Sequence, residues 1–180
     1  MILRNYYKII ELIAKGSSEN YYAVFKGQTG ADMTLRYNSS YGESYAATLG
    51  FALSPTISTS NNTSGIQFGT GTTPPTFDDY KLSGSIIAGL TGTLTKDCVN
   101  DEDGNFVITI SATLTNTNST DVTIGEIGYS RSFTGRGTTG NSNAYAYILI
   151  DRTVLDTPVT IPAGGIGQVT YTIRMNYPTA

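Results

Sequence analysis

The second half of the chain alternates apolar and polar residues more regularly than the first half. The segment 105–117 carries an apolar residue at every second position: Phe106, Ile108, Ile110, Ala112 and Leu114. The positions between them hold hydroxyl residues: Thr109, Ser111, Thr113 and Thr115. Successive side chains of a strand point to opposite faces, so this pattern predicts a half-buried antiparallel strand.

Further strands are predicted on both sides of this one. They are the segments 21–27, 32–38, 48–54, 85–95, 122–133 and 144–155. Polar turns rich in Gly, Asn, Ser and Thr separate several of them, at 58–65, 116–121 and 134–143. At least seven short strands separated by turns predict a mainly β chain, folded as an antiparallel β-sandwich of jelly-roll or immunoglobulin-like type.

The end of the chain contains two predicted strands joined by a corner. The strand 144–155 is followed by the corner 157–165, which holds Pro158, Pro162, Gly164 and Gly165. The last strand, 167–177, places these residues on one face: Val169, Tyr171, Ile173 and Met175. We predict that the two strands form the closing hairpin of the sandwich.

The beginning of the chain has the spacing of a short amphipathic helix rather than of a strand. In the segment 2–15, apolar residues recur at helical spacing: Ile2, Leu3, Tyr6, Ile9, Ile10, Leu12 and Ile13. Gly16 is a natural stop. We therefore predict a helical arm at 1–16 and a single β-sandwich domain at 17–180, with its core strands at 66–177. The helix packs either on its own domain or on a neighbouring subunit.

The segment 66–82 predicts an ordered loop. Gly69 and Gly71 permit unusual backbone angles, whereas Pro74 and Pro75 force an extended path. A phosphate-binding loop would need a following Gly-Lys-Ser/Thr and the start of a helix, and neither is present. A loop that lies along a sheet edge or against a partner is the better interpretation.

The composition narrows the class of protein. Hydrophobic residues make up 39% of the 180 residues and charged residues only 14%, with a net charge of −3. Such a surface is neutral and rich in hydrogen-bonding groups, so we expect no nucleic-acid partner. No apolar stretch is long enough to span a membrane, so no membrane partner is expected. Cys98 is the one cysteine, which excludes an intrachain disulfide.

Candidate catalytic chemistry is sparse. The sequence has no histidine, which removes the His-dependent nucleophile systems and the usual zinc sites. Neighbouring carboxylates occur at Asp78 and Asp79 and in the segment 101–103, but adjacent residues of a strand point to opposite faces. A hairpin turn at Gly104 is the better interpretation of 101–105 than a calcium loop. We expect no enzyme activity, no metal and no cofactor.

One charged pair is predicted between neighbouring strands. Glu126 is a lone carboxylate in an apolar strand, "IGEIGY", and a general acid is one interpretation of it. An outward-facing or arginine-paired residue is the alternative. Arg152, in "LIDRTVL", is a suitable partner, because a charged pair between neighbouring strands would fix their register.

Four stretches carry a resemblance to a known class of proteins: "GTGTTPPTFDDYKLSG" (69–84), "TNTNSTDVTIGEIGYS" (115–130), "LIDRTVLDTPVTIPAGG" (149–165) and "QVTYTIRM" (168–175). In this order they resemble tailed-bacteriophage virion structural proteins. The resemblance covers roughly residues 69–175, and Tyr129 stands where an aliphatic residue is more typical. It implies location in the virion and a role in the head, neck or tail.

The expected function is therefore that of a structural protein that self-associates as a homo-oligomer and binds other virion proteins. Capsid decoration or stabilisation is the first expectation, a neck or tail component the second, and a surface adhesin that binds a host glycan or receptor the third. The residues predicted to make contacts lie on the helix and on the loop: Leu3, Tyr6, Tyr7, Ile10, Gly69, Gly71, Pro74, Pro75, Phe77 and Tyr80.

Overall fold

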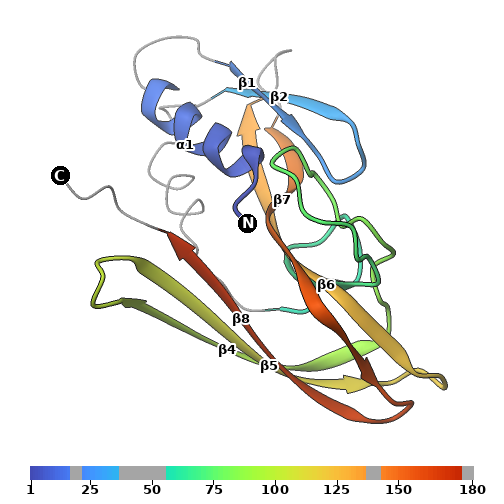
Figure 1. Cartoon of the computed structure of the whole chain (residues 1–180). Coiled ribbons are helices and arrows are strands. Elements are labelled where there is room, and N and C mark those ends of the chain that lie inside the picture. The colour runs from blue at the N-terminus through green and yellow to red at the C-terminus, as the bar shows by residue number, and fades with distance from the viewer. Residues whose placement is uncertain (17–21, 37–55, 137–142, 176–180) are drawn as a thin grey trace.

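The computed structural model describes residues 1–16, 22–36, 56–136 and 143–175. The chain is mainly β, with two antiparallel sheets packed together, as in a β-sandwich (Figure 1). The elements are α1 (Arg4–Gly16), β1 (Tyr22–Lys26), β2 (Asp32–Arg36), β3 (Gly65–Gly69), β4 (Leu90–Asn100), β5 (Phe106–Asn116), β6 (Val122–Arg136), β7 (Asn143–Ile161) and β8 (Ile166–Met175).

The smaller sheet contains three strands in the order β4-β5-β8. The eleven residues of β4 pair with β5 without a break, from Leu90 opposite Asn116 to Asn100 opposite Phe106. The alternation predicted for β5 is confirmed, since Ile108, Ile110, Ala112 and Leu114 are buried. The opposite face of the sheet carries the hydroxyl residues and faces solvent.

The larger sheet is organised around β6, which has neighbours on both sides. β7 pairs along one side of β6, and β3 pairs along the other, where Gly69 lies opposite Glu126. The short β1–β2 hairpin joins the far end of β6 through Arg36 opposite Arg136. All five residues of β3 are buried. Ile66 and Phe68 face the core, whereas on the other face Gln67 contacts Gln28 and Gly69 lies against Leu82 of the segment 70–85.

The hydrophobic core fills the space between the two sheets. Its members come from nearly every strand: Phe25, Ile66, Phe68, Leu90, Ile108, Leu114, Ile127, Tyr129, Ile148, Ile150, Tyr171 and Ile173. One polar contact also joins the sheets, because the Tyr171 hydroxyl on β8 donates a hydrogen bond to Asp151 on β7. Burial, and then the charge of Asp151, raise the pKa of Tyr171 well above its ordinary value.

The predicted closing hairpin is wrong. β7 pairs with β6 in the larger sheet, whereas β8 pairs with β5 in the smaller sheet, so the corner carries the chain from one sheet to the other. Asn116, which is fully buried, holds this crossing. Its side-chain amide donates hydrogen bonds to the carbonyls of Thr120, Ile161 and Pro162 at 2.9–3.1 Å. The two chain crossings, β5 to β6 and β7 to β8, are thereby joined at one residue.

Two strand boundaries also differ from the prediction. Residues 65–69, predicted as the start of a loop, form the buried strand β3. The predicted strand 85–95 begins only at Leu90 and continues to Asn100. Gly89 has a positive φ of 73°, which ends the irregular segment before β4. Ile86 makes only an isolated bridge to Gly69.

β7 is longer than predicted and includes part of the predicted corner. Pro158 lies in a stretch where the register with β6 is interrupted, between the pairs Ile124–Val159 and Glu126–Val154. Proline has no N–H to donate, so it is tolerated at such an irregularity of a ladder. The predicted strand 48–54 and most of the predicted turn 134–143 lie outside the described residues.

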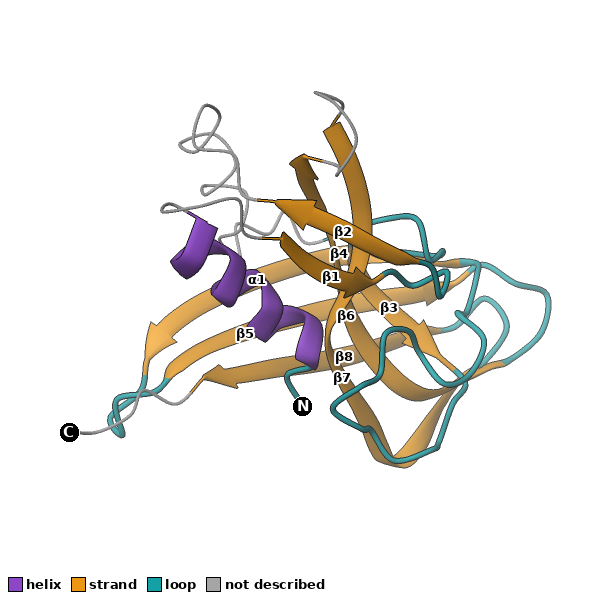
Figure 2. Ribbon diagram, turned by 90° about the horizontal axis from the view of Figure 1, so that it is seen from above, coloured by secondary structure: helices purple, strands orange, loops and turns teal. Residues whose placement is uncertain are grey.

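The predicted helix is confirmed as α1, and it packs on its own domain. Ile9 joins the main core, and Asn5 exchanges two hydrogen bonds with the backbone of Lys26 in β1. The residues before the helix lie along the edge of β7, where the Leu3 N–H donates to the Ile150 carbonyl at 2.8 Å. Figure 2 shows α1 beside β1. Whether the helix also contacts a neighbouring subunit stays a prediction.

Candidate contact surface

The outer face of α1 and the segment 70–85 meet at an exposed aromatic surface. The rings of Tyr7 and Phe77 have centroids 5.7 Å apart. Tyr7 is 53% exposed, Ile10 46% and Phe77 43%. We call Tyr7, Ile10 and Phe77 the contact patch. The contact residues predicted on the helix and those predicted on the loop therefore contribute to one surface.

Arg4 joins the two halves of the contact patch at its margin. The Arg4 guanidinium lies 5.1 Å from the centroid of the Phe77 ring and 2.5 Å from an Asp78 carboxylate oxygen. The Arg4 N–H also donates to the Phe77 carbonyl at 2.9 Å. The exposed ion pair contributes little to stability, but the three contacts together fix the helix start against the loop.

Several predicted contact residues are not accessible in this chain. Leu3 is fully buried in a small cluster with Leu82 and Leu149, so its side chain is not accessible to a partner in this structure. Gly69 is buried in β3. Tyr6, Gly71, Pro75 and Tyr80 are half-buried, whereas Pro74 is exposed. Among the predicted contact residues, the accessible ones are therefore the contact patch and Pro74.

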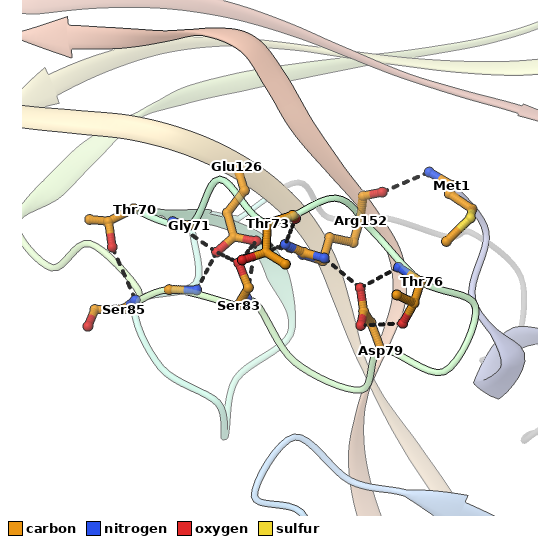
Figure 3. A network of polar contacts seen from close by, with 11 residues as sticks. Met1, Thr70, Gly71, Thr73, Thr76, Asp79, Ser83, Ser85, Glu126 and Arg152 are labelled. Atoms are coloured by element: carbon orange, nitrogen blue, oxygen red, sulfur yellow. Dashed lines mark hydrogen bonds and ion pairs between the residues drawn. The ribbon is translucent and has the colours of Figure 1, made fainter.

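A buried charged pair on β6 and β7 is joined by polar contacts to the segment 70–85, which carries Phe77 (Figure 3). Arg152 on β7 is 1% exposed and Glu126 on β6 is 0% exposed. The Arg152 Nε lies 2.6 Å from Glu126 Oε2, so the pair predicted from the sequence is formed. Its proposed role in setting the strand register stays a prediction.

The remaining guanidinium donors of Arg152 reach the segment 70–85. Nη1 donates to Asp79 at 2.5 Å, and Nη2 donates to the Thr73 carbonyl and the Ser83 hydroxyl, both at 2.7 Å. Asp79 in turn accepts hydrogen bonds from the Thr76 N–H and hydroxyl at 2.9 and 2.7 Å. One buried arginine thus holds both ends of the loop that carries Phe77.

Glu126 is satisfied by backbone groups as well as by Arg152. Its Oε1 accepts hydrogen bonds from the N–H groups of Gly84 and Gly71 at 2.7 and 3.1 Å, and its Oε2 accepts one from the Ser83 N–H at 3.1 Å. These approaches require glycine, because a Cβ on Gly84 would lie 2.3 Å from the Gly71 nitrogen. The carboxylate therefore anchors the loop at two glycines.

The electrostatics of Glu126 oppose a general-acid role. Burial raises the pKa of Glu126, but the hydrogen bonds from Gly84, Arg152 and Ser83 and the charge of Arg152 outweigh burial and leave the pKa lowered. The pKa of Asp79 is also lowered, because Thr76 and Arg152 outweigh the effect of its burial. A carboxyl group with a lowered pKa is ionised at neutral pH and holds no proton to donate.

Other chemistry considered from the sequence finds no support. Asp101 accepts hydrogen bonds from the N–H groups of Asn105 and Asp103 at 2.8 and 3.1 Å, and Gly104 has a φ of 77°, so 101–105 is a hairpin turn. Within the described ranges, no three His, Cys, Asp or Glu residues are grouped as metal ligands. Cys98 is exposed on β4.

Sequence reasoning missed the other polar partners of Arg152. Asp79 and Ser83 were not predicted as partners of Arg152, because their positions depend on how a 16-residue irregular segment folds back. A second buried cluster was also missed, in which the Gln67 side-chain amide donates to Gln28 and to the Ser60 carbonyl at 3.0 and 2.9 Å. The one available signal was Gln67 itself, a polar residue between Ile66 and Phe68.

Comparisons with known proteins do not assign the chain to a family. No family model, no curated protein and no solved structure matches the chain. The helix in the described part of the chain is too short to cross a bilayer.

Proposed function

We propose that this chain is a non-enzymatic structural protein of a tailed-bacteriophage virion, which self-associates and binds other virion proteins. Decoration or stabilisation of the capsid is the first role, and a place in the neck or tail is the second. The observation that carries the proposal is the contact patch, three large apolar side chains exposed together and supported by a buried network. The sequence resemblance over residues 69–175 supplies the virion context.

The contact patch has the composition of a protein-binding surface. Aromatic side chains and arginine are enriched at the centres of interfaces, and here Tyr7 and Phe77 lie in ring contact beside Arg4. Their backbones are fixed by α1 and by the Arg152 network. A surface that is already ordered loses less conformational entropy on binding, so it binds more tightly for the same area.

The test is to find the chain in particles and to weaken the contact patch. Virus particles from the source cells are purified, and mass spectrometry measures the copy number of the chain in each particle. We expect a fixed copy number, lowered by Phe77→Ser or Tyr7→Ser. Val159→Ser is the matched control, because Val159 is 44% exposed on β7 outside the patch. Absence of the wild-type chain from the particles would overturn the proposal.

A glycan-binding role is the second candidate, and one pocket favours it. A pocket of about 390 Å³ lies between residues 59–61 and 81–86. Asn61, Lys81 and Ser85 line it, above the apolar side chains of Leu82 and Ile86. Tyr129 does not support this role, because it is 1% exposed and so cannot stack on a sugar, and burial raises its pKa to about 12. A glycan array probed with wild type and Asn61→Ala tests the pocket, and no hit would remove this candidate.

A further inference from the structure

The edge strand β4 has features that do not belong to the contact patch. Within the described residues it has one neighbour, β5, so no described strand pairs with the N–H and C=O groups of its other edge. One of these N–H groups, that of Cys98, donates to the Asp97 carboxylate of the same strand. Every residue from Thr95 to Asn100 is exposed, on both faces of the sheet. The core-facing residues of β8, the other outer strand, are instead buried or half-buried, as Tyr171 and Ile173 show.

β4 also has few of the devices that usually protect an edge. Natural edge strands are short, or carry proline, bulges or several lysines, which prevent pairing with another chain. β4 has eleven residues in unbroken register with β5, no proline and a single lysine, Lys96. A long, regular and exposed edge of this kind is a template for a further antiparallel strand.

We propose that β4 pairs with β4 of a second copy of this chain, across a twofold axis at Thr95, so that two three-stranded sheets become one six-stranded sheet. This inference deepens the self-association in the proposed function and rests on it, but it uses a different surface. A twofold axis perpendicular to the sheet is the symmetry that joins two identical edges in antiparallel pairing.

The register of this β4–β4 pairing follows from the overlap of the two strands and from the positions of their charged residues. With Thr95 on the axis, residue 90 lies opposite residue 100 of the second copy, and all eleven residues of β4 are paired. Lys96 then lies opposite Leu94, and Asp97 lies opposite Thr93. Registers centred on Lys96 or Asp97 would place like charges directly opposite each other, which destabilises a strand pair. The full-overlap register, by contrast, places no two like charges opposite each other.

The same register predicts which cysteines can be cross-linked. The two copies of residue 95 lie directly opposite, with Cα atoms about 4.5–5.5 Å apart, within the range that a disulfide can bridge. The native Cys98 lies opposite Gly92, six residues from its own counterpart, or about 20 Å along the strand. A cysteine at 95 should therefore link two copies, whereas Cys98 should not.

The experiment uses purified full-length chain with Cys98→Ser, to which Thr95→Cys is added. Mild oxidation should give disulfide-linked dimers under native conditions and not in denaturant. Thr113→Cys on the same background is the matched control. Thr113 is exposed on the same face of the sheet, but it lies on β5, one strand away from the edge. Its two copies would be about 20 Å apart, because three strand spacings separate them laterally and four residues separate them along the strands, so this variant should stay monomeric on denaturing gels.

A second variant tests the pairing without cysteine chemistry. Thr95→Lys places two ammonium groups opposite each other on the axis and should raise the dimer dissociation constant about tenfold, measured by analytical ultracentrifugation. Thr113→Lys should leave that constant unchanged, and circular dichroism checks that both variants fold. Cross-linking at 95 together with this loss supports the proposal.

Three results would overturn the pairing at β4: no link at residue 95, a link through Cys98 in the oxidised wild type as efficient as the link at 95, or Thr95→Lys without effect. These results are separate from the particle test. If the chain is found in particles but residue 95 does not link, the edge pairing fails while the virion role stands. If residue 95 links but the chain is absent from particles, the virion role fails and the edge pairing stands.

Discussion

The outer faces of the two sheets differ in what covers them. The segment 70–85 covers the part of the larger sheet's outer face around Glu126 and Arg152. The three buried charged residues of the described chain, Glu126, Asp151 and Arg152, all lie on the strands β6 and β7 of this sheet. The outer face of the smaller sheet is open to solvent and carries hydroxyl residues such as Thr93 and Thr113.

The difference follows from what each face must satisfy. An irregular segment brings unpaired backbone N–H and C=O groups, and these need partners when water is excluded. Glu126 and Arg152 supply such partners in the larger sheet. In the smaller sheet the backbone groups are paired within the ladder and water satisfies the threonine hydroxyls, so no buried charge is needed. The contrast predicts which substitutions lower the free energy of unfolding most.

The largest effect is expected from breaking the buried pair. Arg152→Met leaves the fully buried Glu126 carboxylate without its cation and should lower the free energy of unfolding by about 3–5 kcal/mol. Arg174→Met is the matched control, because Arg174 is 57% exposed and lies 3.6 Å from Asp101; it should cost less than about 1 kcal/mol. Urea unfolding measures both. Equal losses for the two arginines would contradict the contrast between the sheets.

The next largest effect separates the two faces of β5. Leu114→Ala removes a fully buried side chain and should lower the free energy of unfolding by about 2–5 kcal/mol. Thr113→Ala, its neighbour on the exposed face, should change that free energy by no more than about 0.5 kcal/mol. The same urea titrations compare them, and a large loss for Thr113→Ala would show that the hydroxyl face is not simply solvated.

Whether a structural feature could be predicted from the sequence depends on how far apart in the sequence the contacting residues lie. The faces of β5 were predictable, because alternation is a local property of the strand. The Glu126–Arg152 pair was predictable as well, since each is a lone charge in an apolar strand. Asp79 was not, because its contact with Arg152 requires the fold of an irregular segment.

The errors have similar physical causes. β3 was missed because "GIQFG" is short and holds only two apolar residues between glycines, so its alternation is too brief to distinguish a strand from a loop. The pairing of β8 was missed because neighbouring strands in sequence usually form hairpins, and nothing local in 157–165 shows that the chain changes sheets there. β4 was placed too early because the apolar "SIIAGL" resembles a strand, whereas Gly89 adopts a positive φ.

A smaller effect is expected from crowding the loop anchor. Gly84→Ala places a Cβ against the Gly71 backbone, so the segment 70–85 must shift from Glu126, at a cost of about 1–3 kcal/mol. Ser85→Ala, at the next and exposed position, should cost no more than about 0.5 kcal/mol. Thermal unfolding followed by circular dichroism compares the two. An unchanged Gly84→Ala variant would mean that the loop tolerates displacement.

The smallest effect is a pH dependence located in the larger sheet. The folded pKa of Glu126 is lowered from the ordinary value of 4.5, so its contribution to stability is complete above about pH 4.5 and is lost as the pH falls through the folded pKa. We therefore expect the free energy of unfolding of the wild type to fall below pH 4.5. Glu126→Gln should be less stable at pH 7 and should lose less on acidification. A steeper acid loss in the variant would contradict the lowered pKa.

The crossing held by Asn116 has a consequence for folding. β5 and β8 are neighbours in space, yet β6 and β7 lie between them in sequence, so the smaller sheet cannot be completed before the larger sheet's central hairpin has returned the chain to it. Contacts of such long sequence separation slow folding, because the loop must close before the pairing stabilises it. We therefore expect the two sheets to unfold as one cooperative unit, and neither sheet to be stable as an excised fragment.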